Sequence, residues 1–408
     1  MFLCDKSRVE DKIKTFATFG DTGNGGITRL ALSDACIQAR DEFVRRMKAA
    51  GAVIETDDMA NVYATLPGSD PTARRISMGS HCDSVVKGGN YDGILGVLGG
   101  MEVIEAIASQ KIPHKHPITA MIWTNEEGAL YPPAMMASGV ICGKFDKDTA
   151  LASKGINGRT FGEALSDSGY AGSQSNRFGA KDYSANFELH IEQGPILESQ
   201  GKDVGVVPCV LGMVNYRVKA YGQRNHAGTT PMSFRKDALH AAAQALLYLH
   251  DKLDKLDPAL VYTTGEIVCH PCIHTVIPDY VDFSIDARHE DPKVIAQVVE
   301  IIGSIPAQLA KCRIETQKMW ARDTVYFDTT LVDAVQKSAD ALGYSNMRVN
   351  SGAGHDAQYT AGIVPTTMIF VPSKEGRSHC EEEHTSLEQC WQGMNVLLGA
   401  VLHADAKL

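Results

Sequence analysis

Histidine, aspartate and glutamate residues stand where four predicted strands end in this 408-residue chain. The clearest case is GSHCDSVVKGGNYD, in which His81 and Asp92 are eleven positions apart. Residues 75–80 before the pair predict a buried strand, and helical spacing of apolar residues in 93–108 predicts a helix after it. We therefore expect His81 at a strand end and Asp92 at the mouth of the next helix, where ligands collect in open α/β sheets. A neutral imidazole beside a carboxylate suits a divalent transition metal.

Three further apolar runs stop in the same way. Residues 121–124 precede Glu126 and Glu127, residues 183–191 carry His190 near their end, and residues 364–371 precede His379. One such run would usually end in an ordinary solvated loop, and a single His–Asp pair is more often structural. Four of them make a shared metal site the better interpretation.

These strand ends supply three imidazoles and two carboxylates as candidate metal ligands: His81, Asp92, Glu127, His190 and His379. They suffice for two divalent ions about 3.5–4 Å apart that share one carboxylate, for which Asp92 is the natural candidate. Two such ions would lower the pKa of a bound water towards about 7 and polarise a carbonyl, which hydrolyses amides without a protein nucleophile. Zinc, manganese, cobalt and nickel all accept such ligands.

Neighbouring carboxylates could assist these ligands. Glu126 is the candidate general base that takes a proton from water and passes it to the leaving nitrogen, although alone it could equally be a surface carboxylate. Asp83 is expected to hold the second ring nitrogen of His81, and Glu383 is expected to do the same for His379.

Other chemistries have little support in the sequence. The chain lacks a GxSxG motif, so a serine triad is not indicated. The glycines of residues 93–100 lack the GxGxxG order of a dinucleotide loop and are expected to allow close helix packing. Cys269-His270-Pro271-Cys272 is one CxxC without a second pair, and we interpret it as coincidence.

The composition is typical of a globular enzyme, with 44% hydrophobic and 22% charged residues. A formal charge of −10 argues against nucleic-acid and anionic-membrane partners. No apolar run approaches the roughly 18–20 residues of a membrane span. The N-terminal MFLCDKSRVEDKIK lacks the features of a secretory signal, and ten scattered cysteines suit reduced thiols, so we expect a cytoplasmic protein.

The order of predicted elements divides the chain into two domains. Strand and helix alternate to about residue 200 and again from about 326, which predicts an α/β catalytic domain of residues 1–210 and 326–408 with a mostly parallel sheet. The residues between them predict an inserted α+β domain, 211–325, with one antiparallel sheet. Its expected strands are 214–221, 261–268 and 280–286, and its expected helices are 236–255 and 294–310.

Several blocks together resemble the M20 family of metallopeptidases and amidohydrolases, and within it the carbamoylase branch. That branch contains N-carbamoyl-L-amino acid hydrolases, β-ureidopropionase and allantoate amidohydrolase. The likeness covers nearly the whole chain and rests on these blocks in this order: GITRLALS, GSHCDSV with GGNYDGILGV, TNEEGALYPPAM, FELHIEQGP, NHAGTTPM, VIP ahead of Asp286 and Arg288, SGAGHDAQ, and the SH before Glu383.

The resemblance implies a two-metal catalytic domain and a smaller lid domain through which two chains form a homodimer. One ion would be held by His81, Asp92 and His190, the other by Asp92, Glu127 and His379, with Glu126 as the base. The implied substrate contacts are His226 to the developing oxyanion, Arg288 to a substrate carboxylate, Gln193 to the substrate amide, and Gly352–His355 as a backbone wall. Lid residues of this family can serve the partner's site, so a dimer could be needed for activity.

The chain departs from the family pattern at three places. Thr275 stands where the branch usually has an asparagine that helps to hold the substrate carboxylate, Leu130-Tyr131 replaces an arginine-containing pair, and His384 replaces an aromatic residue. The expected reaction is metal-dependent hydrolysis of a small substrate that carries a carboxylate, an N-carbamoyl or similar N-acyl amino acid. The alternatives are hydrolysis of allantoate or a related ureide, an aminoacylase or dipeptidase, and a non-catalytic binding protein.

Overall fold

The computed structural model describes residues 2–408, which divide into two compact units. Unit 1 comprises the described residues up to Pro208 together with Tyr326–Leu408, and unit 2 is Cys209–Val325. None of the helices in the described range is both long enough and apolar enough to cross a membrane.

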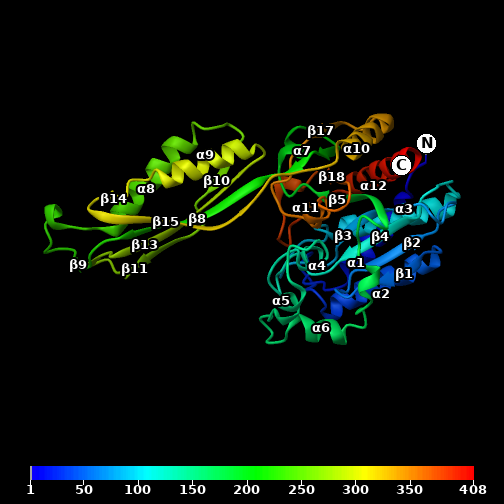
Figure 1. Cartoon of the computed structure of the whole chain (residues 1–408), viewed down its shortest axis with the longest axis horizontal. Helices are drawn as coiled ribbons and strands as arrows, with labels where there is room; N and C mark the ends of the chain where they lie inside the picture. Colours follow the sequence, from blue (N-terminus) through cyan, green and yellow to red (C-terminus); the bar gives the residue numbers. More distant parts are fainter. Residues whose placement is uncertain (1) are drawn as a thin grey trace. The chain divides into compact units, whose positions relative to one another are not determined.

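Unit 1 is built on an eight-stranded sheet in the order β1-β2-β4-β3-β5-β18-β6-β17 (Figure 1). The four central strands β4, β3, β5 and β18 are parallel, whereas β2 and β6 flank them in antiparallel register. This confirms the predicted α/β fold with a mostly parallel sheet. The strands are β1 (Val53–Thr56), β2 (Val62–Leu66), β3 (Arg75–His81), β4 (Ile118–Trp123), β5 (Tyr183–Ile191), β6 (Val204–Val207), β17 (Asn346–Arg348) and β18 (Thr366–Val371).

Helices cover this sheet, and α3, α10 and α12 pack directly on its central strands. Ser33 and Ser386 cap α2 and α12, as expected of hydroxyl side chains at helix starts. The helices of unit 1 are α1 (Lys6–Ala17), α2 (Asp34–Ala49), α3 (Ile94–Gln110), α4 (Met136–Ile141), α5 (Lys147–Ala152), α6 (Phe161–Asp167), α7 (Ile196–Ser199), α10 (Thr329–Leu342), α11 (Asp356–Thr360) and α12 (Leu387–Lys407), with short 3-10 turns at Gln174–Asn176 and Lys374–Gly376.

Glycines bring α3 unusually close to the sheet. A Cβ on Gly96 would lie 2.5 Å from the carbonyl oxygen of Leu189 and 2.7 Å from the Cβ of Ser80. A Cβ on Gly100 would lie 3.1 Å from the carbonyl oxygen of Met78. The interpretation of these glycines as packing residues is confirmed, and the close approach fixes where α3 begins.

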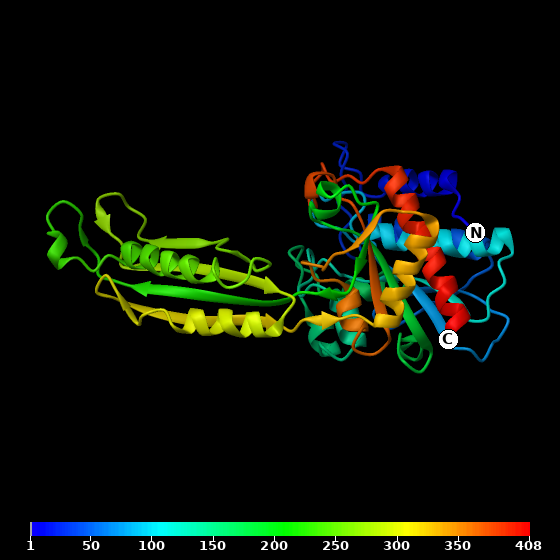
Figure 2. The same ribbon diagram turned by 90° about the horizontal axis from the view of Figure 1, so that it is seen from above.

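Unit 2 contains a six-stranded antiparallel sheet in the order β10-β13-β8-β15-β14, with β11 also paired to β13 (Figure 2). Helices α8 and α9 pack on β8 and β13 and against each other. Val214, Val218 and Ala220 alternate along β8 towards these helices. The elements are β8 (Gly212–Tyr221), β9 (Asn225–His226), a 3-10 turn (Met232–Phe234), α8 (Ala238–Leu253), β10 (Val261–Thr263), β11 (Ile267–His270), β12 (Val276–Ile277), β13 (Tyr280–His289), α9 (Pro292–Gly303), β14 (Gln308–Leu309) and β15 (Cys312–Arg322), and short β7 (Cys209–Val210) pairs with β16 (Val325–Tyr326).

Two predicted elements of this unit are wrong in extent. The helix expected over 294–310 ends at Gly303, because Pro306 disfavours a helical conformation at Ile305 and cannot itself continue the hydrogen-bond ladder. The strand expected over 261–268 is two strands, β10 and β11, separated by a segment that contains Gly265. The long strand β15 was not predicted.

Candidate metal centre

The candidate ligands of unit 1 gather at one edge of its sheet. The strands β3, β4, β5 and β18 are parallel, so their carboxyl ends lie at the same edge. His81 is the last residue of β3, Glu126 follows β4, His190 is next to last in β5, and His379 lies in the loop after β18. Asp92 enters this edge from the loop that precedes α3.

His81, His190 and Asp92 form the first group of ligands, with one ligand atom of each within 4.8 Å of the others. The Nε2 atoms of His81 and His190 lie 3.5 Å and 3.2 Å from the same carboxylate oxygen, Asp92 Oδ1. Their Nδ1 atoms contact the backbone carbonyl oxygens of Asp83 and Ile191, each at 2.9 Å. These bonds place the proton on Nδ1 and turn Nε2 towards Asp92, the tautomer that can bind a metal.

Asp92, Glu127 and His379 form the second group, again within 4.8 Å. His379 Nε2 lies 3.3 Å from Asp92 Oδ2 and 3.4 Å from Glu127 Oε2. Glu127 Oε1 is buried and has no hydrogen-bond partner within the described residues, which is costly unless something binds it. The two oxygens of Asp92 therefore face two different sets of ligands, and the donor set fits a pair of divalent cations that share this carboxylate.

Asp92 is positioned by the adjacent Gly93 and by Glu383 and Ser378 of the loop after β18. Gly93 has φ 65°, and a Cβ there would lie 2.2 Å from atoms of the His81 ring. Glu383 accepts hydrogen bonds from the backbone N–H of Asp92 and of Tyr91, each at 3.0 Å. Ser378 Oγ lies 2.8 Å from Asp92 Oδ2 and 2.9 Å from Glu383 Oε2.

Glu383 was expected to orient His379, and this is wrong. The chain turns at His379, which has φ 57°, and the Glu383 side chain packs against Gly89, where a Cβ would lie 2.2 Å from its carboxyl carbon. This position brings Glu383 to the Asp92 loop instead of the imidazole.

Glu126 lies beside the first group, with Oε2 3.6 Å from His81 Nε2. Glu126 is 7% exposed, and this burial raises its pKa well above the usual range. The charge of His81 lowers the pKa, whereas the charges of Asp356 and Glu127 raise it further. A raised pKa makes the carboxylate a stronger acceptor for a proton from water, which suits a general base.

Asp83 plays a different part from the one expected of its side chain. The His81 ring nitrogen contacts the backbone carbonyl of Asp83, while the Asp83 carboxylate accepts hydrogen bonds from the backbone N–H of Glu126 at 3.3 Å and of Glu127 at 3.2 Å. Asp83 therefore joins the ends of β3 and β4 through the backbone of Glu126 and Glu127.

The residues of the second group shift one another's pKa. Burial and the Asp92 charge raise the pKa of Glu127 to about 7. The contact with Asp92 raises the pKa of His379 to about 9. Burial opposes ionisation of Asp92, but His190, His379 and His81 hold its pKa well below the usual range. Asp92 therefore stays ionised, whereas Glu127 and His379 gain or lose a proton at higher pH.

Gln193 and Gly352 are the expected substrate residues of unit 1. Gln193 has φ 56°, and its Nε2 donates to Asp92 Oδ2 at 2.8 Å while Oε1 is buried without a hydrogen-bond partner in the described chain. Gly352 is exposed and begins the segment that ends at His355, whose ring lies 4.6 Å from that of His190.

Glu188 was not predicted from the sequence as a metal ligand. With His190 and His355 it forms a third group of candidate metal ligands, which shares His190 with the first group. Glu188 accepts hydrogen bonds from Ser80 Oγ at 2.6 Å and from the backbone N–H of Ala357 at 2.9 Å. Because Glu188 and His190 are two apart on β5, they point to the same face of the sheet, and this spacing was the available signal.

Two of the departures from the family pattern take structural roles in unit 1. The His384 ring packs edge-on against Tyr91, with centroids 5.7 Å apart. Tyr131 is buried and packs edge-on against Phe161, with centroids 5.6 Å apart.

His226, Thr275 and Arg288 belong to unit 2. His226 on β9 pairs with Val276, and its Nδ1 accepts hydrogen bonds from the N–H groups of Gly228 and Thr229, which leaves Nε2 available. Thr275 is exposed, and its carbonyl accepts from the Ala227 N–H.

Arg288 lies far from these two residues within unit 2. It is eight residues beyond Tyr280 on β13, and β12 and β9 continue the pairing of β13 and β8 past Tyr280. At about 3.4 Å per residue, the strand places Arg288 more than roughly 27 Å from His226. The Arg288 Nε atom bonds to Asp286 Oδ1 at 2.7 Å.

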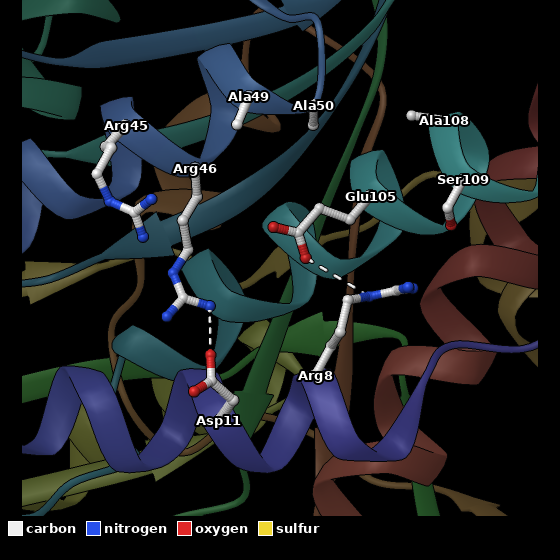
Figure 3. A pocket seen from close by; sticks show the side chains of 9 residues that line it. All are labelled: Arg8, Asp11, Arg45, Arg46, Ala49, Ala50, Glu105, Ala108 and Ser109. Carbon is white, nitrogen blue, oxygen red and sulfur yellow. Dashed lines mark ion pairs between the residues drawn. The ribbon is translucent and has the colours of Figure 1, made fainter.

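A separate pocket of about 580 Å³ lies among α1, α2 and α3 (Figure 3). It is lined by none of the candidate ligands. Its arginines already face carboxylates: Arg8 pairs with Glu105, Arg46 with Asp11 and Arg45 with Glu42. We assign no catalytic role to this pocket.

The profile of peptidase family M20/M25/M40 matches residues 72–403, and the chain belongs to this family. It is 38% identical to the N-carbamoyl-L-amino-acid amidohydrolase of Rhizobium meliloti, over 97% of this chain and 95% of that protein. It is 34% identical to the allantoate amidohydrolase of Bacillus subtilis, over 97% of each chain. The crystal structure of a hydantoinase/carbamoylase family amidase from Burkholderia multivorans matches with a TM-score of 0.90 at 40% identity, over 98% of both chains. The expected resemblance is confirmed.

Proposed function

We propose that the protein hydrolyses the carbamoyl amide bond of an N-carbamoyl amino acid, with two divalent ions held by His81, Asp92, Glu127, His190 and His379. The observation that carries the proposal is the Asp92 carboxylate, whose Oδ1 faces two imidazoles and whose Oδ2 faces a third. The relatives named above support a carbamoyl substrate.

The residues around the ions would move the protons. When bound, the ions would activate a water molecule and polarise the substrate carbonyl. Glu126 would accept the proton from the water and donate it to the leaving nitrogen, and the raised pKa of its carboxyl group suits both steps. Asp83 would keep the Glu126 backbone in place through its hydrogen bond to the N–H.

The residues of unit 2 would bind the substrate. Arg288 would clamp the carboxylate with a charge-assisted hydrogen bond, and His226 Nε2 would donate to the developing oxyanion. A distance of more than roughly 27 Å in one unit is far longer than an N-carbamoyl amino acid. The two side chains could therefore act on one substrate only if they come from different chains, which supports a homodimer with unit 2 as the lid and dimerisation domain.

The supporting experiment is a substrate panel with the metal-loaded protein. Ammonia release would be measured with N-carbamoyl-L-amino acids, N-carbamoyl-β-alanine and allantoate, and release of a free amino acid would be measured with N-acetyl amino acids and dipeptides. Turnover of the first class is expected. Turnover of allantoate alone would favour the activity named for the Bacillus subtilis relative. Activity on none of them would contradict the proposed substrate.

Elemental analysis of the same preparations would show whether zinc, manganese, cobalt or nickel occupies the site, since all four accept this donor set. Size-exclusion chromatography with light scattering would test the dimer. A cytoplasmic location is also proposed, and cysteines that form no disulfide within the described residues support it.

A further inference from the structure

Two buried cysteines lie in contact near the strand ends of unit 1 that carry the candidate metal ligands. Cys36 is on α2, Cys82 directly follows His81, and their sulfur atoms are 3.7 Å apart. Both side chains are 0% exposed. A disulfide needs the sulfurs at about 2.05 Å, so a modest approach of α2 and the end of β3 would join them.

Arg40 lies beside this pair, one helical turn after Cys36. Its guanidinium is fully buried, with Nε 3.5 Å from Cys36 Sγ and other nitrogens bonded to Thr124 Oγ1 and the Ala60 carbonyl oxygen. Within the described residues no carboxylate oxygen comes within the 4.0 Å ion-pair distance of Arg40. A buried cation without an anion is costly, and a Cys36 thiolate would supply the anion. The hydrogen bond from Cys82 lowers the pKa of Cys36 to about 6, against the effect of burial and with help from the Arg40 charge.

We propose that Cys36 and Cys82 are a modification site at which a hydroperoxide forms an internal disulfide. The Cys36 thiolate attacks one oxygen of hydrogen peroxide, the O–O bond breaks, and the products are a sulfenic acid and hydroxide, which takes up a proton to become water. The Cys82 sulfur attacks the sulfenic sulfur, the S–O bond breaks, and the oxygen leaves as a second water with the Cys82 proton. The two sulfurs lose two electrons in total, and the peroxide gains them.

The disulfide would disturb the metal centre because both partners are tied to it. Cys82 lies between His81 and Asp83, and Asp83 holds the backbone of Glu126 and Glu127. Arg40 holds Thr124 at the end of β4. Only the predicted loss of turnover rests on the proposed function, whereas the disulfide itself does not.

The experiment uses the full chain with Cys272→Ser, which removes the exposed cysteine of the CxxC segment. After treatment with hydrogen peroxide, non-reducing digestion and mass spectrometry should show a peptide pair joined through Cys36 and Cys82. Turnover of an N-carbamoyl amino acid should fall by about 10²-fold, as for a displacement of about 1 Å, and dithiothreitol should restore it. Oxidised glutathione should leave Cys36 and Cys82 unmodified, because both thiols are fully buried.

Two variants serve as comparison. Cys36→Ala should abolish both the linked peptide and the reversible loss of turnover. Cys312→Ala removes another fully buried thiol, in unit 2, and should preserve both. Mass spectrometry of the Cys272→Ser protein shows whether the disulfide forms even if Cys36→Ala does not fold. Absence of the linked peptide overturns the proposal, and a linked peptide with unchanged turnover overturns the effect on the metal centre. A protein that turns over no substrate before oxidation contradicts the proposed function alone.

Discussion

The two units present their candidate residues in opposite ways. In unit 1, four candidate ligands from distant parts of the chain converge on the carboxylate of a fifth, Asp92, at a sheet edge, and each group of ligand atoms lies within 4.8 Å. In unit 2, His226 is exposed and stands far along the sheet from Arg288. The candidate ligands of unit 1 are thus already grouped within one unit. The candidate substrate-binding side chains of unit 2 are far apart within the unit and could contact a substrate only singly. We infer that the chemistry depends on unit 1 and substrate recognition on unit 2.

The strongest test of the grouped ligands of unit 1 is Asp92→Ala. Asp92 is the one carboxylate that faces both groups, so its loss should remove both ions. Turnover should fall by more than about 10⁴-fold, which is the largest loss expected from removing a general base alone. Elemental analysis and turnover would be measured together. Asp58→Ala is the control, because this carboxylate of unit 1 pairs with Arg177 and Lys147 instead of the ligands. Retention of both ions by the Asp92 variant would refute the shared carboxylate.

Glu126→Gln separates proton transfer from ion binding. The amide keeps the shape of the side chain but cannot accept the proton, so kcat should fall by about 10²–10⁴-fold while the ion content stays unchanged. If the ions are lost as well, Glu126 is a ligand and not the base.

Arg288→Ala tests the recognition role of unit 2. Loss of a charge-assisted hydrogen bond of about 1.5–3 kcal/mol should lower kcat/KM by about 10–100-fold with little change in ion content. Arg217→Ala is a matched control on β8, since Arg217 pairs with Glu266 and Asp282. An equal loss in the control would mean that the effect comes from the stability of unit 2.

The affinity of Asp92, Glu127 and His379 for a divalent ion should rise with pH. Without the ion, His379 stays protonated up to about 9 and Glu127 up to about 7, and both protons must leave when the ion binds. The affinity should therefore rise roughly tenfold per pH unit between 7 and 9 and more steeply below 7. Titration with zinc in buffers from pH 6 to 9 would measure the slope, and a flat profile would show that these residues are not the ligands.

The sequence was informative wherever a local pattern sufficed. The apolar runs before His81, Glu126, His190 and His379 predicted strands that the structure contains, and the glycines of α3 predicted close packing. The less regular parts failed for local reasons: Pro306 ends α9 early and Gly265 lies in the break between β10 and β11. Strand β15 went unnoticed because most of its residues are exposed and its polar and apolar residues do not alternate regularly.

The sequence by itself determined that four strands end in metal-binding residue types, and that the chain has the blocks of its family. Only the tertiary structure decided which atoms those residues face. In the structure, the Asp83 carboxylate accepts hydrogen bonds from the backbone of Glu126 and Glu127, and Glu383 accepts one from the backbone of Asp92. Cys36 lies in contact with Cys82. The physical reason is that strand periodicity fixes which face a side chain takes, whereas its partner depends on pairing and loop conformation between segments far apart in the chain.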